Sequence, residues 1–584
     1  MSVRNLTRLV LQGTAAAAIA LAATIDTAGA HEPTTGASPM TPEVFDPGLA
    51  AMDGRPWYAP RPEDRPVLLD GLGRPLLPDA PMTAAARAWF DQGLALAVAF
   101  NHAEALRAFR EAQRLDPACA LCAWGEAYVL GPNLNAPMAE GALPLAADAA
   151  RRARALADGG STVEQALADA VAARYAIDAD DGLRLDPEAY AHAMTQAAAD
   201  SDEPTLAMLA ADALMNLQPW DYWADGGSAA KGRTADALAL LEDALDRNPS
   251  HPGLIHFYIH LVEASDRPER AEPYADRLAE LMPGAGHIVH MPAHIYLRIG
   301  RYRESVATNI DAIAADEAVF AALGRRDGGI YGQGYYPHNL HFALVSAQMA
   351  GDAATTLDAA QKLAGLVSVE AAGEAAWLQP ILQAPWLARA RFEDPATLLA
   401  RPEGPAERAY PFVAAARHYA RAVAAVRGGD TATAAAEREA VAAIRTGADF
   451  SALDAGGVPA GDVLDIALAV IDGRAALAAG DAEQAVEAFR RGAALQDGLP
   501  YMEPPYWDAP VSQALGAALM RAGRPGEAMA AFQDALDRHP NSGWALWGLA
   551  EAAEAAGDRT AADDARRRFA AAWLGDGEPS LNRL

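Results

Sequence analysis

The sequence predicts an all-α protein built from repeated pairs of antiparallel helices. From Thr83 onward the apolar residues recur with the 3.6-residue period of helices. Gly, Ala and aromatic residues recur at fixed offsets, and Pro249 and Pro283 stand 34 residues apart, which indicates internal repeats. With 52% apolar and 21% charged residues, the 584-residue chain has an ordinary globular composition, which excludes wholesale disorder.

The first thirty residues have the pattern of a secretory signal peptide. Arg4 and Arg8 precede an apolar stretch at 9–23, and Ala28-Gly29-Ala30 is a small-x-small site for cleavage after Ala30. The stretch is shorter than the roughly 20 residues that a membrane-spanning helix needs. We therefore expect residues 1–30 to be removed, leaving a periplasmic or secreted protein without membrane insertion.

Residues 31–82 are predicted to form an extended arm. Residues 31–81 hold eleven prolines, which favour polyproline-type chain over helix. Cleavage after Ala30 would make His31 the new N-terminus, where a free amine and a ring nitrogen together can chelate a copper-like ion. The alternative for His31 is a solvated chain end.

Two segments carry the repeat pattern most clearly. The first has Trp89, Gly93, Leu96, Ala105, Phe109, Ala112 and Pro117. The second has Gly516, Leu519, Gly523, Ala528, Phe532, Ala535 and Pro540. These residues stand at the consensus spacing of the tetratricopeptide repeat (TPR), which the chain resembles over most of residues 83–575. Gly and Ala lie where paired helices approach closely, and the aromatic residues fill the gaps between neighbouring pairs.

The resemblance to TPR proteins implies a right-handed α-solenoid whose first helices line a concave face. We expect an N-terminal TPR array at 83–365 and a C-terminal array at 412–584. An irregular, Pro-punctuated junction at 366–411 would separate them. Strings at 100–105, 290–296, 503–507 and 541–546 further resemble a group of exported bacterial TPR proteins with a His-rich N-terminal array. That resemblance implies architecture and no particular activity.

Histidines concentrate in the N-terminal array. Eight of the 13 in the chain fall between 251 and 341: His251, His256, His260, His287, His290, His294, His338 and His341. Apart from His251, they occupy positions of three successive first helices that face the groove in TPR proteins. Spacings of three, four and seven residues also place them on one helix face. Pro292 should kink the helix between His290 and His294.

Packed imidazoles cannot satisfy one another, and protonated ones repel, so a bound metal ion is the leading interpretation. Copper or zinc suits imidazole in an exported protein, and iron is a further candidate. The predicted ligands are His256, His260, His287, His290, His294, His338 and His341, with His251, His31 and Glu263 as additional candidates. Seven or eight rings could serve two ions, or one ion with a shell of hydrogen-bonding rings. Nitrogens on one ion should lie roughly 3–3.5 Å apart.

Other interpretations of the cluster remain open. The histidines could bind an acidic peptide, sense pH or simply pack. If an ion keeps an open position, the protein would be a metal-dependent oxidoreductase or hydrolase; the catalytic residues are unknown. The alternative function is a non-catalytic scaffold that binds a protein or peptide near 501–507 and 544–547.

The chain has two cysteines, Cys119 and Cys122. A local disulfide between them is the default for an exported protein, with a metal pair or a redox couple as alternatives.

The net charge of the chain is strongly negative. Asp and Glu number 77 against 47 Lys and Arg, giving a net charge of −30. That charge repels phosphate backbones and anionic lipids, so we expect no nucleic-acid partner.

Overall fold

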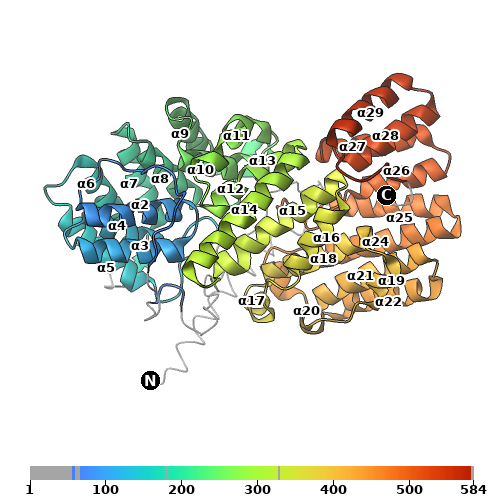
Figure 1. Ribbon diagram of the computed structural model, residues 1–584, viewed down its shortest axis with the longest axis horizontal. Coiled ribbons are helices and arrows are strands. Elements are labelled where there is room, and N and C mark those ends of the chain that lie inside the picture. Colours follow the sequence, from blue (N-terminus) through green and yellow to red (C-terminus); the bar gives the residue numbers. More distant parts are fainter. Residues whose placement is uncertain (1–55, 60–65, 178–181, 327–328, 581–584) are drawn as a thin grey trace, which may run out of the picture. The chain divides into compact units, whose positions relative to one another are not determined.

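A computed structural model describes residues 56–59, 66–177, 182–326 and 329–580. The predicted signal peptide, the predicted cleavage site after Ala30 and His31 lie outside the described residues. The chain is all-α, as predicted, and successive helices run side by side in antiparallel pairs (Figure 1). The described residues of the Pro-rich arm, 56–59 and 66–82, contain no helix or strand.

The N-terminal helices form consecutive pairs, each followed by a short connection. They are α2 (Ala84–Val98) with α3 (His102–Leu115), α4 (Ala120–Val129) with α5 (Leu143–Leu156), α6 (Thr162–Ala173) with α7 (Pro187–Ala199) and α8 (Pro204–Met215) with α9 (Thr234–Arg247). Then come α10 (Pro252–Val262) with α11 (Glu272–Leu281), α12 (Gly286–His290) and α13 (Pro292–Ile299) with α14 (Tyr302–Leu323), and α15 (Tyr336–Ala350) with α16 (Ala353–Leu363).

Shorter helices follow in the segment predicted as a junction. They are α17 (Val369–Glu374), α18 (Gln379–Phe392), α19 (Pro395–Ala400) and α20 (Pro405–Ala409). Regular pairs then resume: α21 (Pro411–Gly428) with α22 (Thr431–Gly447), α24 (Ala460–Ala479) with α25 (Ala482–Asp497), α26 (Val511–Arg521) with α27 (Pro525–Arg538), and α28 (Gly543–Ala556) with α29 (Arg559–Ala572). The short helix α23 (Ser451–Ala455) lies between α22 and α24.

Non-α elements occupy connections. Strands β1 (Tyr175–Ile177) and β2 (Leu183–Leu185) pair antiparallel with Tyr175 opposite Leu185. Strands β3 (Trp223–Ala224) and β4 (Ala229–Ala230) form a second small hairpin with Trp223 opposite Ala230. Single turns of 3-10 helix lie at Asp225–Gly227, Pro268–Ala271 and Ala376–Leu378, and a π-helical turn at Tyr331–Tyr335 leads into α15.

Phenylalanines seated on glycines lock neighbouring pairs together. The ring of Phe109 lies between Gly93 of its own pair and Gly125 of the next, where an added Cβ would meet the ring at 2.8 and 2.3 Å. Phe532 stands in the same relation to Gly516 and Gly548, with 2.7 and 2.3 Å. Only glycine lets the helices approach this closely. The TPR spacing seen in the sequence therefore corresponds to actual packing at both ends of the chain.

A Gly-Asp dipeptide makes the turn inside several helix pairs. Gly351, Gly429, Gly480 and Gly557 end first helices in the left-handed region, at φ 83°, 79°, 84° and 83°. The Asp that follows each one accepts a hydrogen bond from the backbone N–H three residues later and so caps the second helix. One dipeptide thus both stops a helix and starts the next.

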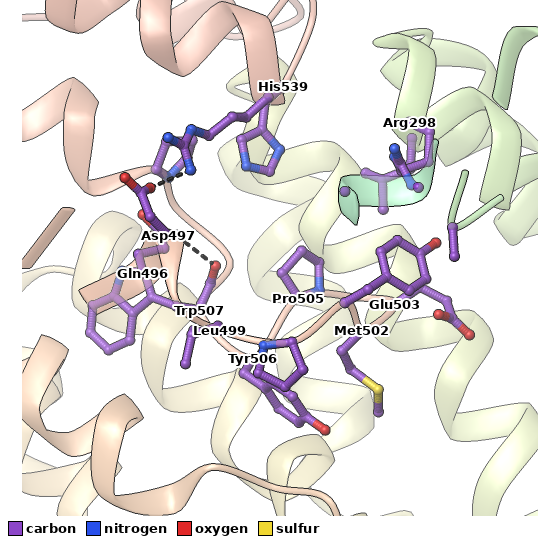
Figure 2. A pocket seen from close by; sticks show the side chains of 18 of the residues that line it. Arg298, Gln496, Asp497, Leu499, Met502, Glu503, Pro505, Tyr506, Trp507 and His539 are labelled. Atoms are coloured by element: carbon purple, nitrogen blue, oxygen red, sulfur yellow. Dashed lines mark hydrogen bonds and ion pairs between the residues drawn. The ribbon is translucent and has the colours of Figure 1, made fainter. Parts of the chain in front are cut away.

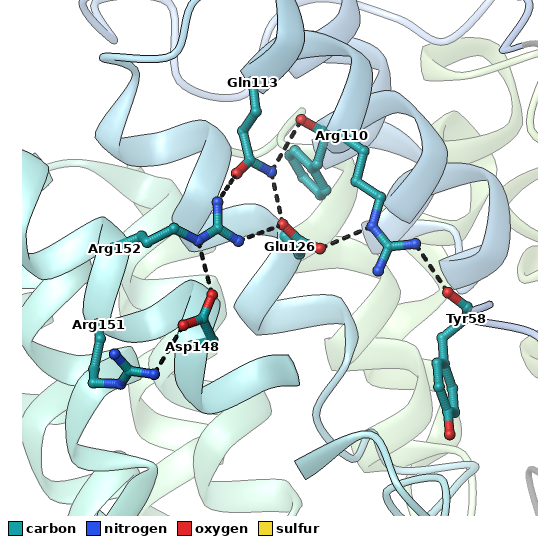
Figure 3. A network of polar contacts seen from close by, with 8 residues as sticks. Tyr58, Arg110, Gln113, Glu126, Asp148, Arg151 and Arg152 are labelled. Carbon is teal, nitrogen blue, oxygen red and sulfur yellow. Dashed lines mark hydrogen bonds and ion pairs between the residues drawn. The ribbon is translucent and has the colours of Figure 1, made fainter. Parts of the chain in front are cut away.

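Charged side chains tie α3, α4 and α5 together at the surface. Glu126 of α4 accepts hydrogen bonds from Arg110 at 2.8 Å, Arg152 at 2.9 Å and Gln113 at 2.9 Å (Figure 3). Because three neighbouring helices contribute to one carboxylate, the network fixes their relative rotation as well as their spacing.

The two predicted arrays contact one another near α15. The indole N–H of Trp544 in α28 donates to the carbonyl of Gln348 at 2.8 Å, and the backbone N–H of Leu574 donates to the carbonyl of Ala350 at 2.8 Å. Within the described part of the chain, none of the helices has both the length and the apolar character needed to cross a bilayer.

Candidate metal centre

The clustered histidines come from three consecutive first helices of the N-terminal array. His256 and His260 lie on α10, His287 and His290 on α12, His294 on α13 and His338 on α15. Helix α10 contacts α13, and α12 contacts α15, so the faces that carry these rings meet. The six rings fall into two groups of three, and within each group one potential ligand atom per residue lies within 4.8 Å of the others.

The first triad consists of His256, His260 and His287. All three side chains are buried, and His256 Nε2 lies 3.1 Å from His287 Nε2. That separation falls in the range expected for two nitrogens on one ion. The Nε2 of His260 and the Nδ1 atoms of His256 and His287 are buried without a hydrogen-bond partner within the described chain. An unpartnered buried nitrogen is costly. An ion bound by Nε2 of His256 and Nε2 of His287 would leave the Nδ1 atoms of both rings without a partner.

The second triad consists of His290, His294 and His338. The Nε2 atoms of His290 and His294 lie 2.8 Å apart, slightly closer than expected for two ligands of one ion. His290 Nδ1 lies 2.6 Å from Asn309 Oδ1. Asn309 in turn donates its amide N–H to the carbonyl of Ser305 at 2.7 Å, which leaves Oδ1 as the acceptor for His290.

Glu263, at the end of α10, joins the two triads. Its Oε1 lies 2.9 Å from Nδ1 of His260 in the first triad, and its Oε2 lies 2.5 Å from Nδ1 of His294 in the second. The hydroxyl of Tyr501 donates to Oε2 at 3.3 Å. A carboxylate that holds Nδ1 of a histidine orients the ring and leaves Nε2 to face a ligand.

These partners assign the tautomers of the second triad. Asn309 Oδ1 is an acceptor, so Nδ1 of His290 carries a proton, and Nδ1 of His294 carries one when the carboxyl of Glu263 is ionised. Two neutral rings protonated on Nδ1 then present bare Nε2 lone pairs to each other across 2.8 Å. Lone pairs at that distance repel unless a cation lies between or beside them. Neutral imidazoles in this arrangement could hold a metal ion.

The rings are neutral at ordinary pH because they are buried. Burial lowers the pKa of His260 and His290 to about 3, and it holds the pKa of His256, His287 and His294 well below its ordinary value. Neighbouring imidazoles add to the depression, since protonated rings would repel. Neutral imidazole is the form that binds metal ions.

Two aromatic side chains pack against the first triad, and both residues have a backbone φ in the left-handed region. Phe100 has φ 56° and places its ring 4.6 Å from the ring of His256 and 5.2 Å from that of His287, centroid to centroid. Trp220 has φ 64°, and its ring meets the ring of His260 edge-on at 5.3 Å. A non-glycine residue in the left-handed region carries strain, and such strain collects at functional sites.

The helix break at Pro292 lies between two of the candidate ligands, His290 and His294. The helix divides at Met291 into α12 and α13, with Pro292 in the first turn of α13. The expected distortion is therefore present, and the rings of His290 and His294 on its two sides approach to 4.7 Å between centroids.

Three predicted residues have other positions or roles. His341 is buried on α15, and burial lowers its pKa to about 3, but it belongs to neither triad. His251 caps α10, where its Nδ1 accepts the backbone N–H of Leu254 at 3.2 Å. Glu263, considered as a ligand, holds the Nδ1 atoms of His260 and His294 instead, although it also lies near Glu503 and His294 in a third possible ligand group.

The sequence did not single out several residues that shape the site. Asn309 comes from the second helix α14, Phe342 packs its ring 4.8 Å from that of His290, and Glu503 comes from the C-terminal array. Phe100 and Glu503 lie in strings that the family resemblance had marked, but nothing in their spacing links them to the histidines. Asn309 and Phe342 carried no comparable signal.

Cys119 and Cys122 lie at the start of α4 and form a disulfide with their Cα atoms 5.3 Å apart. The bond joins the residue that caps α4 to its first turn. It lies outside both histidine triads.

Comparison with known families supports the class of the protein. Residues 509–552 match the model described as "Tetratricopeptide repeat". Together with the packing of glycines against phenylalanines, this identifies a TPR-type α-solenoid. No curated protein sequence matches the chain.

Solved TPR structures align over much of the chain at low identity. The human IFIT1 dimer with m7Gppp-AAAA is 12% identical over 88% of this chain and 96% of its own, with a TM-score of 0.27. Yeast Tom70 is 12% identical over 83% and 92%, also with a TM-score of 0.27. The TPR domain of P58(IPK) is 14% identical over 58% and 93%, with a TM-score of 0.16. At these scores the alignments carry no functional argument.

Proposed function

We propose that this TPR-type solenoid is an exported metal-binding protein that holds two transition-metal ions, one on each histidine triad. The observation that carries the proposal is the pair of Nε2 atoms of His290 and His294, which face each other 2.8 Å apart while both Nδ1 atoms have acceptors. A cation resolves the resulting repulsion, and three imidazoles from rigid helices are a suitable ligand set.

The charge of Glu263 supports the same proposal. Its side chain is fully buried, and burial raises its pKa well above the ordinary value because the environment compensates a negative charge poorly. Ions on the neighbouring triads would provide positive charge close to both carboxylate oxygens. Glu263 would then act as an anionic partner of two metal-bound rings.

Copper and zinc are the proposed ions, with iron as a third candidate. Both bind neutral imidazole well, and three protein nitrogens per ion leave a position for water or substrate. An ion with such a position would supply Lewis-acid or redox chemistry, as in a metal-dependent hydrolase or oxidoreductase. A site filled by further protein ligands would serve storage or sensing.

Export to the periplasm or beyond is part of the proposal. The signal-peptide pattern of residues 1–30 supports it, and so does the Cys119–Cys122 disulfide, since such bonds persist in oxidising compartments.

Elemental analysis of the protein purified from its native export route tests the metal proposal. We expect two ions per chain in the wild type and one in either His256→Ala/His287→Ala or His290→Ala/His294→Ala. The control is His192→Ala, an exposed histidine of α7, which should leave both ions bound. A metal content that neither double variant changes would overturn the proposal.

A non-catalytic TPR scaffold is the second candidate function. The observation in its favour is a cavity of about 390 Å³ lined by the loop that joins α25 to α26, where Tyr501, Tyr506 and Trp507 gather. TPR surfaces of this kind can hold a protein or peptide ligand. Binding of a protein or peptide partner that persists after a chelator has stripped the protein of metal would favour the scaffold.

A further inference from the structure

The cavity of about 390 Å³ lies directly beside the histidine cluster. One side is formed by residues 496–512, the end of α25 and its connection to α26. Other lining residues include His294 and Arg298 of α13, Trp223 and the two glycines that follow β3, and residues 537–539 at the end of α27. Figure 2 shows Arg298 and His539 together with side chains of the 496–507 segment. The volume is in the range of small-molecule binding sites, typically about 300–1,000 Å³.

The cavity shares its inner wall with the space between the triads. A small chamber of about 60 Å³ is lined by His260, His287, His294 and His338. His294, Met502 and Glu503 line both this chamber and the outer cavity. A molecule in the outer cavity would therefore contact His294, a member of the second triad, directly.

The arginines of the cavity already have partners. Arg298 donates one N–H to the carbonyl of Glu263 and another to the carbonyl of Ser265 at 3.1 Å, and its guanidinium lies over the ring of Tyr501. Arg538 forms an ion pair with Asp497 (Figure 2). Since the charges of these two arginines are compensated within the protein, they create no strong demand for an anionic ligand.

Two aromatic side chains of the cavity also donate their polar hydrogens to backbone carbonyls. Trp223 donates its indole N–H to the carbonyl of Leu261 at 2.7 Å, and Tyr506 donates its hydroxyl to the carbonyl of Gly457 at 2.9 Å. What Trp223 and Tyr506 present to a ligand is therefore apolar ring surface. Flat apolar groups pack well against such surfaces.

We infer that the outer cavity is the substrate pocket of the metal centre, and that it takes a small uncharged aromatic molecule. An oxygen or nitrogen donor of that molecule would reach the ion held by His290, His294 and His338. The inference rests on the proposed function, because it requires an ion on the second triad. Glu503, which borders both spaces, would contact the donor end of the ligand.

Two metal-chelating probes, neutral in solution and bound as hydroxamates after each loses its acidic proton to the buffer, separate the contributions of ion and cavity. Benzohydroxamic acid and acetohydroxamic acid carry the same chelating group, and only the first carries an aromatic ring. Each is titrated by calorimetry into protein loaded with copper(II) or zinc. We expect benzohydroxamic acid to bind at least about tenfold more tightly, because its ring is buried in the cavity.

Filling the cavity should remove that preference. Leu499→Trp places a larger side chain in the cavity, away from the triads, and should lower benzohydroxamate affinity about tenfold while acetohydroxamate affinity and metal content stay unchanged. Leu145→Trp, at a side chain 43% exposed on α5, is the matched control and should change neither affinity.

The possible results separate the claim of a substrate pocket from the claim of a metal centre. Equal affinity of both probes for metal-loaded wild type overturns the substrate pocket and leaves the metal centre standing, and this comparison needs no variant to fold. A chain that takes up no metal overturns both. A preference for the aromatic probe that survives in a folded Leu499→Trp also contradicts the inference, because the ring must then bind elsewhere.

Discussion

At the scale of single residues, hydrogen bonds to Nδ1 decide what the histidines can do. Asn309 Oδ1 accepts from His290, and Glu263 accepts from both His260 and His294. The contact with Asn309 fixes the proton of His290 on Nδ1, and the Nε2 atoms of His290 and His294 face each other. The acceptors come from α14 and from the end of α10. The orientation of these three histidine rings therefore depends on side chains that need not bind an ion themselves.

Asn309→Ala should therefore weaken metal binding at the second triad. Without its acceptor, His290 loses the contact that fixes its proton on Nδ1, and such outer contacts are commonly worth about 10–100-fold in metal affinity. Competition with a chromophoric chelator measures the change. Asn248→Ala, at the end of α9, is the control. An Asn309 variant with wild-type affinity at both triads would show that the amide has no such role.

At the scale of helices, the close approach of neighbouring pairs depends on glycine. An added Cβ at Gly548 would lie 2.3 Å from Phe532, whereas one at Gly526, also helical, would meet nothing within 4 Å. The same phenylalanine also packs on Gly516, so one ring reports on the contact between two repeats.

Gly548→Ala is expected to lower the free energy of unfolding by about 1–3 kcal/mol, the usual cost of overpacking. Gly526→Ala is the control. It should cause no loss of unfolding free energy, since alanine favours a helix by up to about 1 kcal/mol over glycine. Denaturant titration of both variants measures the difference. Equal effects of the two substitutions would contradict the packing described for Phe532.

Buried acids between helices make stability depend on pH. Asp212 of α8 accepts from Tyr128 at 3.0 Å and from Asn216 at 2.7 Å, and burial raises its pKa to about 6 against the opposing effect of Arg174. The folded protein thus holds this proton more tightly than the unfolded chain. The stability linked to Asp212 is full below pH 4 and is lost as pH rises through about 6.

Asp212→Asn should remove that dependence. The free energy of unfolding of the variant minus that of the wild type should increase by about 2–3 kcal/mol from pH 4 to pH 7, whatever this difference is at pH 4. Denaturant titrations at a series of pH values give the difference. If the difference in unfolding free energy between variant and wild type does not change with pH, Asp212 has the same pKa in the folded and unfolded states.

At the scale of the whole molecule, the N-terminal histidines and the C-terminal array meet at one place. Tyr501 and Glu503 reach from beyond α25 to the neighbourhood of Glu263 and His294. Trp544 contacts the carbonyl end of α15. The candidate centre is therefore bordered by both arrays, although its histidines all come from the first.

The net charge of −30 makes a further prediction for the intact chain. Polyanions should be repelled, so the protein should not be retained on heparin or bind duplex DNA even at low salt. Retention that weakens as salt is raised would contradict this prediction.

Sequence spacing predicted the fold and much of the histidine cluster, for a physical reason. Gly93, Phe109 and their counterparts report helix contacts local to a repeat, and histidines three or four apart must share a helix face. How the faces of different helices meet depends on rotation and crossing, which spacing does not specify. That is why the division into two triads, the position of His341 and the partners Asn309 and Glu503 emerged only from the structure.

Anomalous diffraction from crystals of the metal-loaded protein tests the central claim most directly. Data at the copper or zinc absorption edge should show two peaks, one about 2.0–2.1 Å from the ring nitrogens of His256, His260 and His287 and one at the same distance from those of His290, His294 and His338. Maps without a peak at either triad, in crystals saturated with the ion, would contradict the account.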